Sequence, residues 1–243
     1  MFRVDLNCDM GEAAGHDAEL MPLITSANIA CGAHAGNIST MSESCARAEE
    51  HGVSIGAHPS LDDRKNFGRR ELPISQAAAA SIVTRQLRAL SAYAKVRHVK
   101  PHGALYTMAA RDPALAQAIA VAVREFDASL ILFGLAGSEL TRAGVAAGLT
   151  VAHEVFADRT YQRDGSLTPR SQPDALVADA QQAAVQAVRM VRAGSVRTTD
   201  GTEIAVRADT ICVHGDGPHA VEFVRALRLA FARTDIQVAR FGT

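Results

Sequence analysis

Residues 53–60 read VSIGAHPS, and this stretch decides the fold class. Val53 to Gly56 is a short β-like run, and most of the runs of this kind in the chain lack clean polar alternation, as expected for strands covered on both faces. The segment before it, Ser39 to His51, has helical spacing and Ser39 as its expected N-cap. The segment after it, Ile74 to Ala94, is also predicted to be helical. A buried strand between two helices indicates a parallel sheet.

The same alternation continues in both directions along the chain. Further predicted strands lie at Arg3–Asn7, Ala27–Ala30, Arg97–Lys100, Leu130–Phe133, Thr150–His153 and Thr210–Val213. Further predicted helices lie at Ala114–Phe126, Pro173–Ala193 and Pro218–Ala232. Residues 196–206, with Asp200-Gly201 at their centre, predict a small β-hairpin insert with a type I′ turn. The pattern predicts the α/β class and a parallel (β/α)7 TIM-like barrel, because polar residues gather at the strand ends.

Length and composition agree with one barrel domain over residues 1–243. Hydrophobic residues make up 48% of the chain, enough for a large core, and the net charge of -1 without a basic stripe argues against a nucleic-acid partner. No apolar run is long enough to span a bilayer, and the first residues lack a signal-peptide pattern, so we expect a soluble cytoplasmic protein. No C-x-x-C spacing occurs, so neither a zinc finger nor a disulfide scaffold is expected from Cys8, Cys31, Cys45 and Cys212.

Ionisable side chains beside Gly or Pro follow six of the seven predicted strands. The segments are Asn7–Glu12, Cys31–Asn37, Gly56–Ser60, Lys100–Gly103, His153–Arg159 and His214–Gly217. In a parallel barrel all strand C-termini open onto one face, and active sites are built from the loops on that face. These segments therefore predict one shared site and an enzymatic function.

Taken together, the segments resemble the LamB/YcsF family. The matching residues are DLNCDMGE (5–12), SANIACGAHAG (26–36), GAHPS (56–60), FGRR (67–70), KPHGALY (100–106), EVFADR (154–159) and ICVHGD (211–216). They occur in order over nearly the whole chain, and their combination is highly specific. The sequence departs from the family pattern at Ala33, where an aromatic residue is common, at residues 61–66, and at Asn37, where the usual Asp and its carboxylate are missing.

The resemblance implies a barrel related to the glycoside hydrolase and deacetylase barrels. It also implies an activity as one subunit of an ATP-dependent 5-oxoprolinase. With two partner subunits, such a subunit opens the lactam of 5-oxo-L-proline to L-glutamate while ATP is hydrolysed to ADP and phosphate. The implied cofactor is ATP with Mg²⁺. The sequence has no G-x-x-x-x-G-K-[ST] motif and no G-x-G-x-x-G motif after a strand, so nucleotide binding can rest with the partners.

Lactam hydrolysis needs a base for water, an acid for the ring nitrogen and groups that stabilise developing negative charge. Asp9 and Glu12 are the candidate bases, and Glu154 is the candidate second carboxylate of an acid/base pair. His102 is a candidate acid or base because the ordinary pKa of histidine lies near neutrality. Lys100 is a candidate anion ligand. The alternatives are structural: Asp9 pairs with Lys100, and Glu12 caps a turn.

Other strand-end residues are candidates for binding the substrate or a phosphate. Arginines suit this role because a guanidinium binds a carboxylate or phosphate through two hydrogen bonds, although loop arginines are often only solvated. The candidates are Asn7, Arg69, Arg70, Asp158, Arg159, His214 and Asp216.

His34 and His58 follow neighbouring strands and are candidate metal ligands together with His102 and Asp9. A hydrogen-bonded polar cluster without metal is the alternative. A metal would favour a second hypothesis, a stand-alone metal-dependent deacetylase or amidohydrolase, and a third is a regulatory subunit that binds a small acid without turning it over. The remaining histidines in loops and helices are expected at the surface: His16, His51, His98 and His219.

Overall fold

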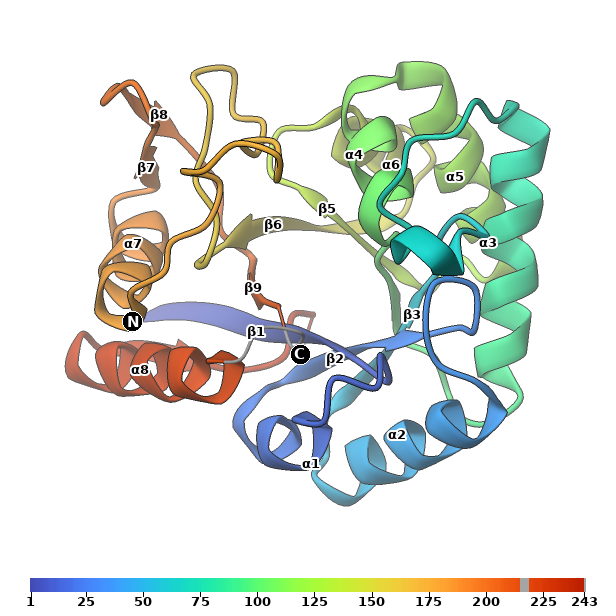
Figure 1. Ribbon diagram of the computed structural model, residues 1–243, viewed down its shortest axis with the longest axis horizontal. Helices are drawn as coiled ribbons and strands as arrows, with labels where there is room; N and C mark the ends of the chain where they lie inside the picture. The colour runs from blue at the N-terminus through green and yellow to red at the C-terminus, as the bar shows by residue number, and fades with distance from the viewer. Residues whose placement is uncertain (215–218, 243) are drawn as a thin grey trace.

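The computed structural model describes residues 1–214 and 219–242, and its centre is a closed barrel of parallel strands (Figure 1). The barrel strands are β1 (Phe2–Met10), β2 (Ser26–Ala30), β3 (Ser54–His58), β4 (His98–Val99), β5 (Ile131–Leu135), β6 (Thr150–Phe156) and β9 (Thr210–Val213). Each strand is hydrogen-bonded to the next, and β9 pairs with both β6 and β1, which closes the ring. The predicted seven-stranded parallel barrel is confirmed.

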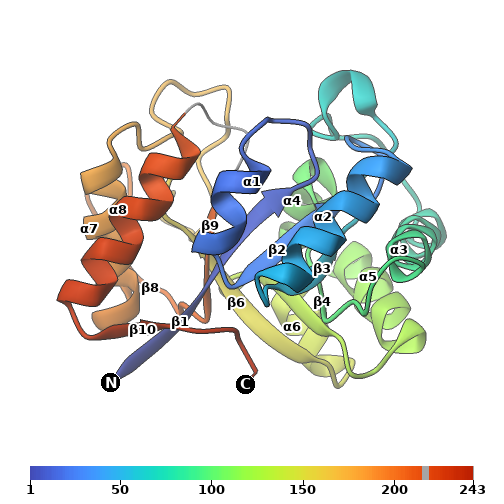
Figure 2. The same cartoon turned by 90° about the horizontal axis from the view of Figure 1, so that it is seen from below.

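The first strand has a different partner at each end. Phe2–Val4 pair in parallel with β10 (Ile236–Val238), whereas Asp5–Cys8 pair with β9. The strand β10 was missed because three residues are too few to show a pattern. As a result, the two ends of the described chain lie at the same end of the barrel (Figure 2).

Helices surround the barrel on its outside (Figure 2). They are α1 (Asp17–Leu20), α2 (Ile38–Glu50), α3 (Gln76–Ser91), α4 (Gly103–Arg111), α5 (Pro113–Phe126), α6 (Glu139–Ala146), α7 (Ala180–Arg192) and α8 (Ala220–Arg233). Short 3-10 turns lie at Met21–Leu23 and Arg64–Asn66. Buried alanines, such as Ala116 and Ala120 of α5, let neighbouring helices pack closely, and α5 packs mainly against α3 and α6. Among the described residues, no helix combines the length and the apolar character that crossing a membrane requires.

Polar caps start several helices where the sequence predicts them. The side chain of Ser75 caps α3, and that of Asp112 caps α5. In α2, however, the cap is Asn37: its side chain accepts a hydrogen bond from the backbone N–H of Thr40, and Thr40 Oγ1 accepts one from the backbone N–H of Asn37. The prediction that Ser39 is the cap is wrong, because this reciprocal capping box places the cap at Asn37, two residues earlier.

Other helix boundaries also differ from the prediction. The helix α7 begins at Ala180, capped by Asp179, and not at Pro173. Residues 173–179 form a loop that is tied to the end of β6, where Thr160 N donates to Ala175 O. The helices α4 and α6 were missed, because they are short and each contains a glycine. The predicted start of the last helix at Pro218 lies outside the described residues.

The hairpin insert is present as β7 (Ser195–Arg197) and β8 (Glu203–Ala205), which pair antiparallel. Its turn is not type I′, because only Gly201 of the predicted Asp200-Gly201 pair has a positive φ, at +84°. The backbone N–H of Thr198 instead donates to the carbonyl of Thr202 and closes a three-residue loop. The Asp200 carboxylate accepts from Thr202 N, which stabilises the longer loop.

The inside of the barrel is polar, whereas branched apolar side chains fill most TIM barrels. Asp5, Asn7 and Asp9 alternate with apolar residues along β1, and all three are buried. The three side chains share one face of β1, and this face points inward, because Asn7 Nδ2 donates at 2.9 Å to Glu154 of β6, a strand that is not a neighbour of β1. Near the bottom of the barrel, Asp5 accepts from the hydroxyl of Thr210 and from hydroxyls at the start of β2.

A second link across the interior joins β2 to β4. The ring of His98 reaches Asn28 Oδ1 at 2.9 Å and stacks on Phe133. The strand between them, β3, has Gly56 at this point, and a Cβ there would lie 2.0 Å from the His98 ring. The prediction that His98 is a surface residue is wrong: it is 1% exposed, because β4 turns its side chain into the barrel.

Candidate active site

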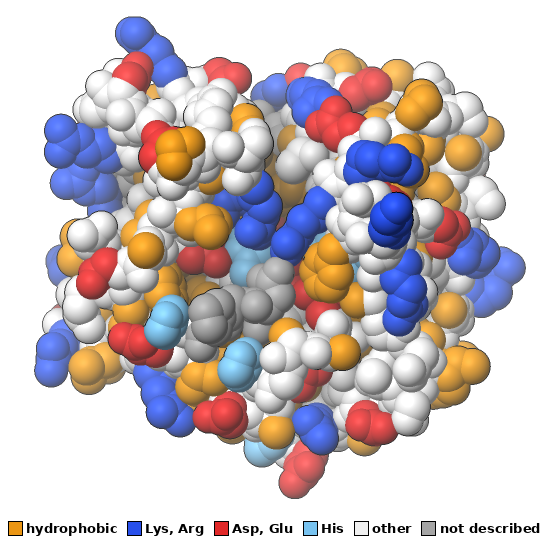
Figure 3. Space-filling model, viewed as in Figure 1, with side chains coloured by type: hydrophobic (Ala, Val, Ile, Leu, Met, Phe, Trp, Pro, Cys, Tyr) orange, Lys and Arg blue, Asp and Glu red, His pale blue; other side chains and the backbone are white. Residues whose placement is uncertain are grey.

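The polar interior opens into a pocket at the C-terminal ends of the strands. Its volume is about 340 Å³. Figure 3 shows Lys and Arg side chains around a hollow with a histidine at its base. The pocket is lined by strand-end residues, by α4 and by the loop after β6, including Asp9, His58, Arg69, Glu71, Lys100, His102, Tyr106, Arg111, Phe156, Arg159, Thr168, Arg170 and His214.

Lys100 is the centre of the charged network at the pocket floor. Its Nζ lies 2.9 Å from Asp9 Oδ1, 2.9 Å from Glu154 Oε1 and 3.0 Å from the sulfur of Cys212. Burial disfavours the charge on Lys100, but attraction to Asp9, Cys212 and Glu154 outweighs it and raises the lysine pKa well above its ordinary value. Lys100 is therefore a fixed cation and not a proton acceptor.

Asp9 lies between this lysine and a group of histidines. Burial alone would raise the pKa of its carboxyl, but His58 and Lys100 hold it well below the usual value. Asp9 Oδ2 lies 3.3 Å from His58 Nε2, and Asp9 Oδ1 also accepts from Asn28. Asp9 is ionised and lines the pocket, as expected for a functional residue. It also pairs with Lys100, which was the structural alternative.

Glu154 does not line the pocket. Its side chain is fully buried, with Oε1 accepting from Asn7 Nδ2 and Lys100 and Oε2 accepting from the hydroxyl of Tyr106 at 2.7 Å. The geometry makes Glu154 an anchor for Lys100 and Tyr106. Burial and the nearby Glu154 carboxylate raise the pKa of Tyr106 well above its ordinary value, so the phenol stays protonated beside the pocket.

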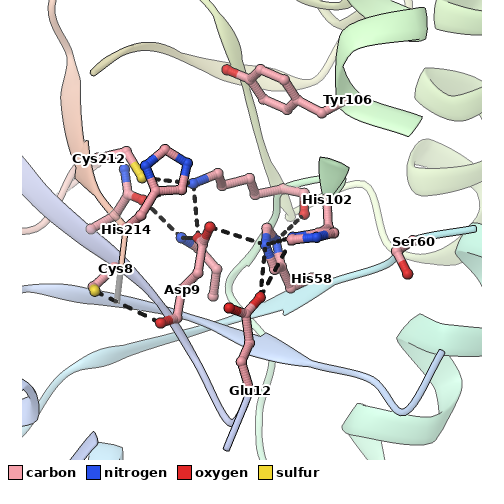
Figure 4. A network of polar contacts seen from close by, with 12 residues as sticks. Cys8, Asp9, Glu12, His58, Ser60, His102, Tyr106, Cys212 and His214 are labelled. Carbon is pink, nitrogen blue, oxygen red and sulfur yellow. Dashed lines mark hydrogen bonds and ion pairs between the residues drawn. The ribbon is translucent and has the colours of Figure 1, made fainter. Parts of the chain in front are cut away.

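Four side chains from four successive strand ends converge beside Asp9, and we call Glu12, His34, His58 and His102 the histidine cluster. Figure 4 shows Asp9, Glu12, His58 and His102 pointing toward one another. One candidate ligand atom from each cluster member lies within 4.8 Å of the other three. A metal ion can be held by such a set.

Burial changes the acid–base properties of these histidines. It lowers the pKa of His34 to about 3, with His58 adding to the effect, and lowers the pKa of His102 well below its ordinary value for the same reasons. His102 was expected to titrate near neutrality as an acid or base. In the fold its Nε2 donates to the carbonyl of Phe67 and its Nδ1 faces His58. The expectation is wrong, because burial lowers the pKa of His102 well below neutrality.

His214, which is not part of the histidine cluster, also lines the pocket. His214 Nδ1 donates to Asp158 Oδ2 at 2.8 Å, and the same oxygen accepts from the His214 backbone N–H. The imidazole stacks on Phe156. Burial would raise the pKa of Asp158, but His214 outweighs it and lowers the pKa. An ionised Asp that holds Nδ1–H of a histidine leaves its Nε2 as the basic atom, which suits a general base.

Cations from separated parts of the chain surround the rest of the pocket. Arg69 lies over the ring of Phe67, and Arg159 is buried with its guanidinium donating to the carbonyls of Thr168 and Ala175. Burial, helped by Arg170, lowers the pKa of Arg159 to about 10, which leaves it charged at neutral pH.

The candidates named from sequence are therefore only partly brought together. Arg70 points away from the pocket: its side chain is 63% exposed and lies 3.7 Å from Asp63. Asn7 supports the network from below, and Asp216 lies outside the described residues. Tyr106 and Arg111 were missed, although α4 brings them to the pocket; had this helix been predicted, the spacing of Tyr106, Thr107 and Arg111 would have placed them on one face.

Comparison with known proteins agrees with the family resemblance of the sequence motifs. The model of the LamB/YcsF family matches residues 4–243. The chain belongs to the LamB/YcsF family. A family relative from Brevibacillus brevis, named as a subunit of 5-oxoprolinase, is 52% identical, and the match covers 98% of each chain.

Solved structures agree with the barrel. The chain is similar to the lactam utilization protein from Thermus thermophilus, with 45% identity, a TM-score of 0.92 and coverage of 98% of this chain and 100% of that one. A polysaccharide deacetylase from Bacillus cereus shares the fold alone, with 14% identity, a TM-score of 0.52 and coverage of 100% and 93%. The expected likeness of this barrel to the fold of deacetylase barrels is confirmed.

Proposed function

We propose that this chain is the barrel subunit of an ATP-dependent 5-oxoprolinase. In this role it binds 5-oxo-L-proline and opens its lactam to L-glutamate, while two partner subunits contribute to ATP and Mg²⁺ binding. The observation that carries the proposal is the pocket, where an oriented histidine and several fixed cations face one small space. Its likeness to proteins named as 5-oxoprolinase subunits supports the substrate. Use of ATP would place the complex in the cytoplasm.

The pocket suits a small anionic amide. The substrate has one carboxylate and one lactam group, and about 340 Å³ lies at the small end of ligand-pocket volumes. Arg69, Arg111 and Arg170 line the pocket and suit the carboxylate, because guanidinium groups bind carboxylates through paired hydrogen bonds. Lys100, Tyr106 and His214 also line the pocket and suit the lactam.

Coupling to ATP overcomes the stability of the amide. Transfer of the γ-phosphoryl group of ATP to the lactam oxygen releases ADP and gives an imidoyl phosphate. Water then adds to the same carbon, the ring C–N bond breaks, and the nitrogen takes up a proton, which leaves an acyl phosphate. A second water cleaves this to the new carboxylate and phosphate. Two waters are consumed for each glutamate formed.

The described residues can be matched to these steps. His214, oriented by Asp158, takes the proton of the attacking water. Lys100 stabilises the negative charge that develops on the oxygen atoms bonded to the lactam carbon. It acts from a fixed position, because its ion pairs with Asp9 and Glu154 hold its ammonium group in place. The Tyr106 hydroxyl, protonated and close by, supplies a hydrogen bond to the reacting group when it turns from Glu154.

The test is reconstitution of the complex. The purified chain is mixed with its two presumed partners, ATP, Mg²⁺ and 5-oxo-L-proline, and glutamate and ADP are measured. We expect both products to form in equal amounts and only when this chain is present. If neither product exceeds the level of the mixture without the chain, the proposed function is wrong.

The histidine cluster favours a second candidate, a metal-dependent deacetylase or amidohydrolase that acts without partners. This candidate predicts that the chain alone, supplied with Zn²⁺, releases acetate from N-acetylated amines or opens lactams without ATP. A chelator should then abolish the activity. Activity that requires the partners and ATP would rule this candidate out.

A further inference from the structure

The hydrogen-bond partners of the histidine cluster fix the positions of its protons. A carbonyl oxygen only accepts hydrogen bonds, so His58 Nδ1, 2.7 Å from the carbonyl of Lys100, carries a proton. For the same reason His102 Nε2, 2.9 Å from the carbonyl of Phe67, carries one. The other two ring nitrogens, His58 Nε2 and His102 Nδ1, lie 2.9 Å apart. With both imidazoles neutral these two atoms are lone pairs and meet with no hydrogen between them, whereas a proton on His58 Nε2 would serve this contact and also Asp9 Oδ2, 3.3 Å away.

The third histidine shows the same arrangement. The hydroxyl of Ser60 donates to the carbonyl of Leu61, and its oxygen therefore accepts from His34 Nδ1 at 2.9 Å. The lone pair of His34 Nε2 then points at Glu12 Oε1, also 2.9 Å away. An ionised carboxylate is only an acceptor. Two contacts in one buried cluster thus join acceptor to acceptor, and a positive charge among these atoms would satisfy both.

Protons are a poor source of that charge. One added proton satisfies only one of the two contacts, so two are needed. With the protons on His58 and His34, two positive charges would lie on rings whose centroids are 5.6 Å apart in a buried site, and with the protons on His102 and His34 the charged rings would be stacked at 3.8 Å. A single ion placed among the four atoms avoids this repulsion.

The spacing of the atoms also suits one ion. Glu12 Oε1 lies 2.9 Å from the facing nitrogen of His34, 3.5 Å from that of His102 and 3.9 Å from that of His58. Ligand atoms held at about 2.0–2.1 Å in a tetrahedron lie roughly 3.3 Å apart, which falls within this range. Each imidazole also gives its other N–H to an oxygen acceptor, as metal-bound histidines commonly do.

We propose that the histidine cluster binds one transition-metal ion of the Zn²⁺ class, with His34 Nε2, His58 Nε2, His102 Nδ1 and Glu12 Oε1 as ligands. Three imidazoles with one carboxylate suit such an ion and not Mg²⁺, so this site is separate from the Mg²⁺ that accompanies a nucleotide. His58 and His102 also line the pocket, so the ion would lie at its floor. When bound there, the ion would polarise a carbonyl oxygen or a water molecule.

Metal uptake by the isolated full-length chain tests the proposal without reference to turnover. The chain is stripped with a chelator, and Zn²⁺ binding is followed by calorimetry with excess Mg²⁺ present. We expect one Zn²⁺ per chain and a higher melting temperature after binding. With Co²⁺ in place of Zn²⁺, we expect the visible d–d bands of a four-coordinate ion and no sulfur-to-metal charge-transfer band, since the proposed ligands are nitrogen and oxygen. Failure to take up a stoichiometric ion would overturn the proposal.

Variants assign the ion to these residues. His34→Gln and His102→Gln remove one ligand each, and Ser60→Ala keeps all ligands but removes the acceptor that orients His34. We expect each to weaken Zn²⁺ binding by at least about ten-fold. His51→Gln changes an exposed histidine and should bind Zn²⁺ like the unchanged chain. Equal binding by all four variants would show that Zn²⁺ is held adventitiously elsewhere, and the proposal would be wrong.

The proposal rests on the structure of the cluster and not on the 5-oxoprolinase reaction, so the two can fail separately. A chain that binds Zn²⁺ but gives no glutamate with its partners would overturn only the proposed function. A chain that gives glutamate but takes up no metal would overturn only the metal site.

Discussion

Asp158 Oδ2 accepts hydrogen bonds from both the backbone N–H and the side-chain Nδ1–H of His214. One carboxylate oxygen thus fixes the ring orientation and leaves Nε2 as the basic nitrogen of His214. The ring also stacks on Phe156, which holds it at the pocket wall. This pair connects the end of β6 to the end of β9, and it provides the clearest test of how the pocket moves protons.

We expect His214→Gln to lower kcat of the reconstituted complex by roughly 10²–10⁴-fold, the usual contribution of general acid–base catalysis. Asp158→Asn should also lower kcat, because the amide no longer favours the required tautomer. The KM for 5-oxoproline should change little in either variant. His51→Gln, on an exposed turn, serves as the control and should keep full activity. Unchanged kcat in His214→Gln would exclude this histidine as the base.

The lowered pKa of Asp158 predicts how stability depends on pH. A carboxyl whose pKa is lower in the folded state stabilises the fold above its unfolded pKa of about 3.9 and loses this effect as the pH falls through the folded value. The difference in unfolding free energy between the unchanged chain and Asp158→Asn should therefore be constant between about pH 5 and 7 and shrink below about pH 4. Urea unfolding at several pH values measures it, and a difference that grows in acid would contradict the assignment.

Lys100 should be essential for stability as well as for activity. Lys100→Met leaves Asp9 and Glu154 buried without their cation, and breaking a buried ion pair in this way costs about 3–5 kcal/mol. Urea denaturation gives the change in unfolding free energy. Lys65→Met, at an exposed lysine, is the matched control and should cost less than about 0.5 kcal/mol. Equal stability of the two variants would show that the network does not support the barrel.

Two neighbouring arginines give a test of substrate binding. Arg69 lines the pocket, whereas Arg70 is 63% exposed and pairs with Asp63. We expect Arg69→Gln to raise the KM for 5-oxoproline by about ten-fold or more, since a hydrogen bond to a charged group contributes about 1.5–3 kcal/mol. Arg70→Gln should leave KM unchanged. The opposite order in steady-state kinetics would place the substrate carboxylate on the other side of this loop.

The close approach of His98 to Gly56 predicts a packing defect. Gly56→Ala places a methyl group against the His98 ring and should destabilise the barrel by about 1–3 kcal/mol. The same substitution in a His98→Ala background should cost clearly less, because the ring that it meets is gone. A double-mutant cycle of thermal or urea unfolding measures this coupling. Additive effects would mean that the two residues do not contact each other.

The sequence predicts those parts of the fold that depend on local patterns, and it does not predict those that depend on contacts between distant residues. The alternation of short apolar runs and longer helical patterns was enough to predict the barrel and its seven strands. Boundaries such as the start of α7 were wrong because Pro173 resembles a helix start, while the loop it lies in is tied to the end of β6 by backbone hydrogen bonds. Contacts of this kind join distant residues, and no local pattern shows them.

The site shows the same limit. The positions of Asp9, Lys100 and His102 on one face follow from strand ends, and the sequence places them correctly in the pocket. The role of Glu154 depends on burial below that pocket, and the shifted pKa of His102 depends on neighbours from other strands. His98 looks like a surface residue beside Arg97, and only the register of β3 and β4 turns it inward.

The pairing of β1 with β9 and β10 also has a consequence for biosynthesis. The strand β1, residues 2–10, gains its neighbours β9 and β10 only when residues 210–238 have been made. Until then, one side of β1 exposes unpaired backbone groups, and contacts so distant in sequence form slowly. A nascent chain in which residues 210–238 are still missing therefore has an open sheet edge at β1, and we expect chaperones that shield such edges to bind it at this stage.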